Sequence, residues 1–271
     1  MTIIKSLTTA SLLTFGILAS SYTTAHVHED KLTQALAGEH RSDKNKARDI
    51  YRHPEKTLAF FGFNPKMTVV EIAPGGGWYT EILAPALKGS GKLYGAHYPD
   101  TGEDNYYSNS RKRLEKKLAG NPVFSEVELT NFVPRKASVL APAGTADLVL
   151  TFRNLHNWGH DGVEQVFKDA AKALKAGGVL GVVEHRMPTD MEWEKNKRSG
   201  YFPQADVVKL AKAAGFTLAA SSEINANPKD TANHPKGVWT LPPVLRLGEQ
   251  DKEKYLAIGE SDRMTLKFVK K

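Results

Sequence analysis

One short stretch constrains the fold more than any other part of the chain: an apolar run breaks at three consecutive glycines and resumes with helix-like spacing. Val69 to Ile72 are apolar except for one glutamate, which is typical of a strand buried on both faces. The glycines at 75–77 follow, and apolar residues then recur at helical intervals over 78–87. This pattern predicts a strand, a tight turn and a helix, the first unit of a parallel α/β sheet.

The glycine turn has two interpretations. Glycines between a strand and a helix let a ligand approach the backbone, and the first N–H groups of the helix attract the anionic part of a nucleotide-like cofactor. A tight crossover is also often rich in glycine for packing reasons alone. The rest of the chain has to decide between them.

The first 25 residues have the pattern of a secretory signal peptide. They contain one cation, Lys5, an apolar stretch over 12–19 and small residues up to Ala25, and no acidic residue precedes Glu29. The apolar stretch is too short to span a bilayer. We therefore expect cleavage near Ala25, a periplasmic or secreted protein, and no stable membrane insertion. An uncleaved anchor and a buried first helix are the alternatives.

Composition limits the remaining classes of function. Removing 25 of the 271 residues leaves 246, enough for one domain with a full core. The net charge of +7 comes from scattered lysines and arginines, which are typical of solvated helix faces rather than of a nucleic-acid-binding surface. The absence of cysteine excludes disulfides and thiolate metal sites. We expect a small-molecule partner and no nucleic acid; the sequence does not indicate an oligomeric state.

Strand-like and helix-like segments alternate along the chain. After the first unit come strand 92–96, helix 105–118, strand 123–129, strand 146–152, helix 163–174, strand 178–184, helix 204–214, strand 216–222 and strand 264–269. The alternation predicts a doubly wound, mainly parallel, seven-stranded α/β sheet over 65–271, which binds ligands at the carboxyl ends of its strands. A helical extension over 26–64 precedes it, and a proline-rich excursion over 225–260 is expected to shape a site.

Polar side chains follow the fourth and fifth predicted strands, where such a sheet places its reaction centre. The run Arg-Asn-Leu-His-Asn-Trp occupies 153–158, and Glu184, His185 and Arg186 end the next strand. We expect His156 and His185 to face one cavity. Either is suited to act as a base, with Glu184 fixing the tautomer; a structural role for each histidine is the alternative.

With these segments placed, the chain resembles class I S-adenosylmethionine-dependent methyltransferases over roughly residues 65–269. The segments 74–80, 152–158, 184–186 and 261–263 are similar to those of an exported bacterial family described as predicted methyltransferases. The resemblance implies a Rossmann-like fold, S-adenosylmethionine as the cofactor and methyl transfer to an unknown small molecule.

In class I methyltransferases an acidic residue ends the first strand, and glycines then pass under the methionine part of the cofactor. Glu71 matches the acid, whereas Ala73 replaces the usual first glycine. The acid that usually binds the ribose from the second strand is replaced by His97. The cofactor contacts implied by the resemblance are Glu71, Ala73, Gly75, Gly76, Gly77, His97 and Asn154.

Methyl transfer needs in-line positioning, exclusion of water and, for a hydroxyl or amine acceptor, removal of a proton. The predicted catalytic residues are His156, His185, Arg153 and Glu184. The predicted substrate contacts are Arg186, Trp158, Tyr79 and Arg263. Their arginines favour an anionic substrate, and their rings offer an apolar wall. A structural ion pair of Arg186 or Arg263 with Asp262 is the alternative.

A binding protein or another enzyme on the same fold is the competing hypothesis, because a fold does not fix a function. S-adenosylmethionine is made and used in the cytosol, whereas this chain carries an export signal. Ala73 and His97 also depart from the usual pattern.

Metal binding is a third hypothesis. After cleavage at Ala25 the chain would begin His-Val-His at 26–28, which suits Cu(II) or Zn(II). A second nitrogen-rich set comprises His156, His160 and His185, but it lacks the spacing of a helical ligand pair. We predict no metal.

Overall fold

The computed structural model describes residues 31–271. The predicted signal peptide and the start of the predicted extension lie outside the described residues. Within 31–271, no helix combines the length and the apolar character needed to cross a membrane.

Seven strands form one sheet in the order β3-β2-β1-β4-β5-β7-β6. The strands are β1 Thr68–Ile72, β2 Lys92–His97, β3 Val127–Asn131, β4 Ala146–Phe152, β5 Leu174–His185, β6 Phe216–Ser222 and β7 Arg263–Lys270. Strands β1 to β5 pair in parallel, and β7 runs antiparallel between β5 and β6. The predicted seven-stranded, mainly parallel sheet is confirmed.

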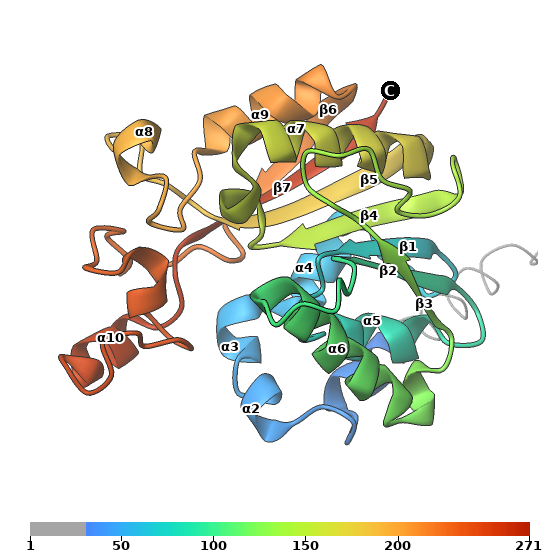
Figure 1. The fold of residues 1–271 in the computed structure, drawn as a ribbon, viewed down its shortest axis with the longest axis horizontal. Coiled ribbons are helices and arrows are strands. Elements are labelled where there is room, and N and C mark those ends of the chain that lie inside the picture. The colour runs from blue at the N-terminus through green and yellow to red at the C-terminus, as the bar shows by residue number, and fades with distance from the viewer. Residues whose placement is uncertain (1–30) are drawn as a thin grey trace, which may run out of the picture.

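Helices cover both faces of this sheet (Figure 1). The helices that follow residue 37 are α2 Asp43–Lys46, α3 Asp49–Arg52, α4 Pro54–Phe61, α5 Thr80–Leu87, α6 Tyr106–Ala119, α7 Leu155–Ala173, α8 Trp193–Asn196, α9 Gln204–Ala213 and α10 Lys252–Ile258. Helices α7 and α9 lie on one face, and α4, α5 and α6 lie on the other. Residues 31–37 are also helical.

The alternation of side chains along the central strands divides the core in two. Val70 and Val149 pack in the cluster with α7 and α9, whereas Val69, Leu148 and Leu150 pack in the cluster with α4 and α5. Burying each such side chain contributes about 1.5–3 kcal/mol. The two clusters hold the central strands firmly, so the loops at their carboxyl ends start from fixed positions.

Three predicted elements were wrong in extent. The strand predicted over 178–184 is β5, which begins at Leu174. The segment predicted as strand 123–129 begins with a 3-10 turn over Pro122–Phe124, because Pro122 starts the turn and the Asn121 side chain accepts from the Val123 N–H. The helix predicted over 163–174 is α7, which starts at Leu155 and breaks at Gly159 with φ 66° and ψ 179°. The polar run 153–158 therefore leads directly into a helix.

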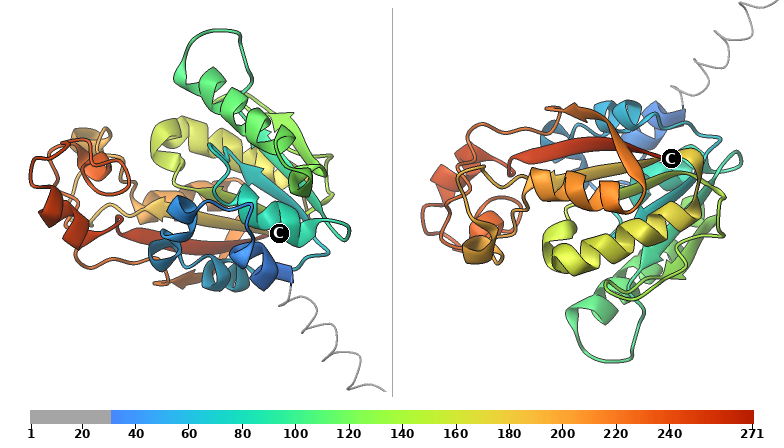
Figure 2. Two further views of the ribbon diagram at one scale, coloured as in Figure 1. Left: turned by 90° about the horizontal axis from the view of Figure 1, so that it is seen from below. Right: turned by 90° about the horizontal axis from the view of Figure 1, so that it is seen from above.

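The segment 225–260 lies at the end of the sheet where β4 and β5 finish (Figure 2). It contains only the 3-10 turn Gly237–Thr240 and α10 as regular helices. Ion pairs join its last part to the N-terminal helices: Glu260 contacts Arg48 and Arg52. Chain segments from both ends of the sequence thus enclose the carboxyl ends of the central strands.

Candidate active site

The turn between β1 and α5 borders open space at two glycines and packs tightly at the third. A Cβ added to Gly75 or Gly76 would meet no atom within 4 Å, whereas one on Gly77 would lie 2.9 Å from Cδ1 of Leu114. Ala73, Gly75 and Gly77 have positive φ angles of 51°, 58° and 79°, a region that favours glycine. Gly75 and Gly76 therefore leave room for a ligand, whereas Gly77 is explained by packing.

Two hollows border this turn, and a third adjoins them. The glycine hollow, of about 320 Å³, borders Gly75 and Gly76. The histidine hollow, of about 230 Å³, borders His156 and His185. The tyrosine hollow, of about 280 Å³, is lined by Tyr98, Tyr106 and Tyr107 among others. Asn154 borders all three, so they form one cleft with Asn154 at its centre.

A fourth hollow of about 490 Å³ adjoins this cleft beside the ends of β2 and β3. It shares Tyr98, Tyr107 and Asn157 with the tyrosine hollow. It is the largest of the four, but it does not border the glycines or the histidines, so we place the chemistry in the other three.

Glu71 lies beneath the glycine turn and does not line the cleft. Its Oε2 accepts from the Thr80 hydroxyl at 2.6 Å, which ties β1 to the first turn of α5. Burial raises the pKa of Glu71 to about 7, although the Thr80 bond lowers it. The carboxyl group therefore titrates near neutral pH.

His97 and Asn154 both make internal hydrogen bonds. The fully buried His97 contacts the Ser110 hydroxyl at 3.3 Å and the Tyr98 carbonyl at 3.2 Å, and burial lowers its pKa. Asn154 donates to the carbonyls of Ile72 and Ala73 at 3.3 Å each. Asn154 borders the cleft while joining β4 to the glycine turn, whereas His97 does not line any of the four hollows.

Glu184 organises the histidine side of the cleft. It accepts from the N–H groups of Leu155 and His185 at 2.5 and 2.7 Å, and it contacts Nδ1 of His156 at 3.0 Å. Because a carboxylate only accepts, it places the His156 proton on Nδ1. In the neutral ring this tautomer leaves Nε2 of His156 as the acceptor nitrogen, with no partner among residues 31–271, on a ring that lines the histidine hollow.

His185 lies beside His156, with ring centroids 5.3 Å apart. Its Nδ1 contacts the Ser261 hydroxyl. Burial, together with His156 and the nearby arginines, holds the pKa of His185 well below its usual value. His185 is therefore neutral at pH 7.

The trio His156, Glu184 and His185 has ligand atoms within 4.8 Å of one another and could hold a metal ion by composition. Three N–H groups already donate to the Glu184 carboxylate. The trio is therefore explained as a hydrogen-bonded unit that orients His156.

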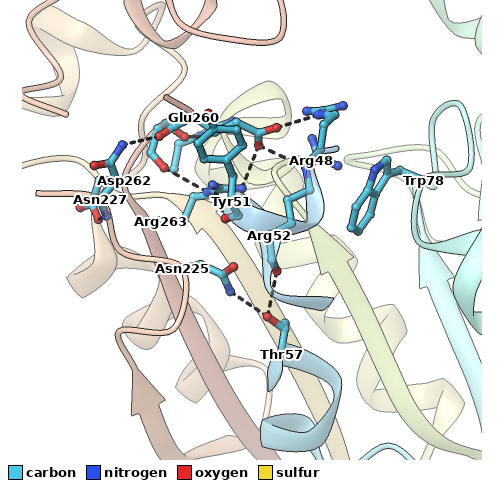
Figure 3. A network of polar contacts seen from close by, with 12 residues as sticks. Arg48, Tyr51, Arg52, Thr57, Trp78, Asn225, Asn227, Glu260, Asp262 and Arg263 are labelled. Atoms are coloured by element: carbon cyan, nitrogen blue, oxygen red, sulfur yellow. Dashed lines mark hydrogen bonds and ion pairs between the residues drawn. The ribbon is translucent and has the colours of Figure 1, made fainter. Parts of the chain in front are cut away.

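Arginines from distant parts of the chain surround one carboxylate, Glu260 (Figure 3). Arg48, Arg52 and Arg263 approach it at 2.6, 3.1 and 3.1 Å. Burial alone would raise the pKa of Glu260, but the arginines outweigh it and lower the pKa to about 2. The Arg52 guanidinium also lies over the Trp78 ring, 4.6 Å from its centroid.

Arg153 is the fourth arginine of this cluster and borders both the glycine and the histidine hollows. Its side chain has no hydrogen-bond or ion-pair partner within 31–271, and its φ is 60°. Burial lowers its pKa to about 10, and repulsion from Arg263 adds to this effect. Within residues 31–271 the structure thus holds a strained, unpaired cation beside the glycine and histidine hollows.

Four predicted substrate contacts do not line the cleft. Arg186 pairs with Asp262 at 2.8 Å and with Glu223 at 2.7 Å, and both raise its pKa. This is the structural ion pair that the sequence left as the alternative. Trp158 is core and donates to the Tyr98 hydroxyl at 2.8 Å. The last two are buried: the Tyr79 ring stacks on the Phe152 ring with centroids 3.5 Å apart, and Arg263 forms an ion pair with Glu260.

Sequence reasoning missed most of the charged wall. Arg48 and Arg52 are spaced four residues apart, the spacing of neighbours on one helix face, and this was the available signal. Glu260 gave no comparable signal, because two of its three arginine partners are more than 200 residues away: 212 to Arg48 and 208 to Arg52.

Known proteins share the fold of this chain but not its sequence. Neither a protein-family model nor a curated protein matches the sequence. Solved structures do match. An S-adenosylmethionine-dependent methyltransferase from Aquifex aeolicus is 15% identical with a TM-score of 0.56, over 82% of this chain and 92% of that one. The chain has the class I methyltransferase fold.

Two further structures with this fold are named for functions that differ from each other. A geranyl diphosphate methyltransferase in complex with GPP and sinefungin is 12% identical with a TM-score of 0.56, over 81% of this chain and 78% of that one. The 4+2 cyclase SpnF is 13% identical with a TM-score of 0.57, over 91% and 93%. At these identities the likeness establishes the fold and leaves the reaction to the residues of the cleft.

Proposed function

We propose that this protein is an S-adenosylmethionine-dependent methyltransferase that acts on a small molecule. The observation that carries the proposal is the set of three connected hollows around Asn154, with open glycines on one side and an oriented histidine on another. A cofactor that spans the glycine turn and an acceptor that reaches the histidine would meet there.

The residues of the cleft fit the cofactor in most respects. Gly75 and Gly76 leave the floor of the glycine hollow open, and Arg48 and Arg52 supply cations for its carboxylate. Aromatic rings in the tyrosine hollow suit a purine. The ribose contact expected from the second strand does not fit, because His97 is buried and bonded to Ser110.

When bound, S-adenosylmethionine would supply an electrophilic methyl group. The protein's own task is then to remove a proton from the acceptor and to exclude water. His156 is the proposed base, since Glu184 keeps its proton on Nδ1 and leaves Nε2 to accept. Neutral His185 closes the same hollow without adding a charge.

Calorimetric titration with S-adenosylhomocysteine tests the cofactor. We expect binding by the wild type, and by Gly76→Ala, because a Cβ at this position meets open space. Gly76→Leu fills the hollow and should abolish binding. Absence of heat from the wild type at millimolar ligand would overturn the proposal.

The His156 role has its own readout. His156→Gln should lower methyl transfer about 10²–10⁴-fold and leave the affinity for S-adenosylhomocysteine unchanged. Glu184→Gln should act through His156, lowering kcat and shifting its pH profile. Equal loss of cofactor affinity in both variants would indicate a structural role instead.

A repurposed small-molecule-binding protein is the second candidate. The internal hydrogen bonds of His97 favour it, because this residue replaces a cofactor-binding acid and is not free to substitute for it. Binding of small ligands in the cleft without binding of S-adenosylhomocysteine would support this candidate.

We also propose that the protein is exported and belongs with the exported bacterial methyltransferase-like proteins that it resembles. The support is the sequence of its first 25 residues, which have one cation, an apolar stretch and a small-residue end.

A further inference from the structure

The arginine cluster carries more positive charge than the cofactor and Glu260 can balance. Arg48, Arg52 and Arg263 pair with the single carboxylate of Glu260, and Arg153 lies near it without pairing. Four guanidinium groups around this one carboxylate leave three positive charges in excess. A cofactor carboxylate would balance one of them. Buried cations without counter-charges are costly, so the excess indicates a second anion.

Arg153 is placed to receive that anion. It is the cluster member without a side-chain partner among residues 31–271, and it borders the histidine hollow as well as the glycine hollow. Its φ of 60° is unfavourable for a residue with a side chain. A strained and unpaired arginine is expected where a ligand, rather than the fold, uses the guanidinium.

Part of the lining of the histidine hollow is apolar. Val238, Trp239, Pro242, Pro243 and Val244 line it. The Trp239 ring lies 5.9 Å from the His156 ring, centroid to centroid, at a steep angle, and the Arg246 guanidinium lies over it, 4.9 Å from its centroid. The hollow therefore offers a cation, an apolar surface and a base.

We propose that the methyl acceptor is a small amphipathic acid. Its carboxylate or phosphate pairs with Arg153, its ring or other apolar part packs against Trp239, and its hydroxyl or amine lies toward Nε2 of His156. The volume of about 230 Å³ is below the range of about 300–1,000 Å³ for drug-sized ligands, so the acceptor is small. This inference rests on the proposed function and names its substrate class.

Calorimetry with three probes tests the inference: benzoate, phenyl phosphate and neutral benzamide. Each is titrated into the wild type with and without saturating S-adenosylhomocysteine. We expect at least one of the two anions to bind in both conditions and benzamide not to bind. The better anion distinguishes a carboxylate site from a phosphate site.

Matched variants locate the binding. Arg153→Gln should weaken the anion at least tenfold, whereas Arg113→Gln, which removes an exposed arginine outside the cleft, should not. Because Arg153 makes no side-chain bond within the described residues, its variant should unfold at or above the wild-type temperature. Trp239→Leu should weaken benzoate and phenyl phosphate but not inorganic phosphate.

The outcomes separate this inference from the proposed function. If S-adenosylhomocysteine binds and neither aromatic anion does, or if Arg153→Gln leaves the anion affinity unchanged, the inference is wrong and the methyltransferase proposal stands. Competition between the anion and S-adenosylhomocysteine would assign Arg153 to the cofactor and also overturn it. If an anion binds in a way that depends on Arg153 and no cofactor binds, the proposed acid-binding site stands and the proposed methyl transfer is overturned.

Discussion

Glu71 shows how burial sets the chemistry of a single residue. Burial raises its pKa from 4.5 to about 7. Between pH 4.5 and pH 7 the folded protein therefore keeps a proton on Glu71 that the unfolded chain has released. Stability from this group is therefore complete below pH 4.5 and declines as pH rises to 7. A cofactor ammonium nearby would favour the charged carboxylate and reverse this trend on binding.

Glu71→Gln tests this directly, because glutamine retains an acceptor for Thr80. At pH 5 the variant and the wild type should unfold with similar free energies. At pH 8 the variant should gain about 3 kcal/mol in unfolding free energy relative to the wild type, as a shift of this size implies. Chemical unfolding at both pH values measures the difference, and an equal difference at both would contradict the assignment.

At the scale of elements, Glu260 links the N-terminal helices to β7. Arg48 and Arg52 come from the segment of α2 and α3, and Arg263 begins β7. Because the arginines lower the pKa of Glu260 from 4.5 to about 2, its stabilisation is present above pH 4.5 and is lost as pH falls toward 2.

Glu260→Gln removes the carboxylate and leaves the arginines without their shared counter-charge. We expect the free energy of unfolding at pH 7 to fall by about 3 kcal/mol or more. Relative to the wild type, hydrogen exchange should become faster over 43–61 to a greater extent than in the sheet. Glu223→Gln is the matched control, since Glu223 pairs with Arg186 while 68% exposed and should cost about 1 kcal/mol or less. Equal effects of the two variants would show that the cluster does not anchor these helices.

Elements were predictable where burial dictates a repeated pattern. The continuous apolar run of β4 and the amphipathic spacing of α9 put their ends within a residue of the observed ones. The start of α7 was missed because polar residues and two glycines interrupt its first turns, while packing of Leu155 and Trp158 against the core still holds it helical. Tertiary burial there overrides local propensity.

At the scale of the whole molecule, the sequence predicted which strand ends would border the candidate cleft but not the charged residues that reach it from outside the sheet. Gly75, Gly76, Arg153, Asn154, His156 and His185 line the cleft. These residues follow strands, so the sheet alone brings them together. Arg48 and Glu260 come from outside the alternating units, and only the folded chain brings them to the same place.

Export is a property of the whole chain, and mass spectrometry of protein recovered outside the cytoplasm tests it. We expect a mature form that begins near His26, because small residues lead up to Ala25. A chain that keeps Met1 or remains in the cytoplasm would contradict the export proposal and would remove the main argument against access to S-adenosylmethionine.

The separation of the cluster's partners along the chain has a consequence for the order of events in the cell. Arg48 contacts Glu260 across 212 residues of sequence. The cleft therefore cannot form until nearly all of the chain has emerged from the ribosome. A chain that crosses a membrane unfolded would carry no ligand with it. It would first bind its ligand at its destination, and the supply of small molecules there would decide which reaction the protein performs.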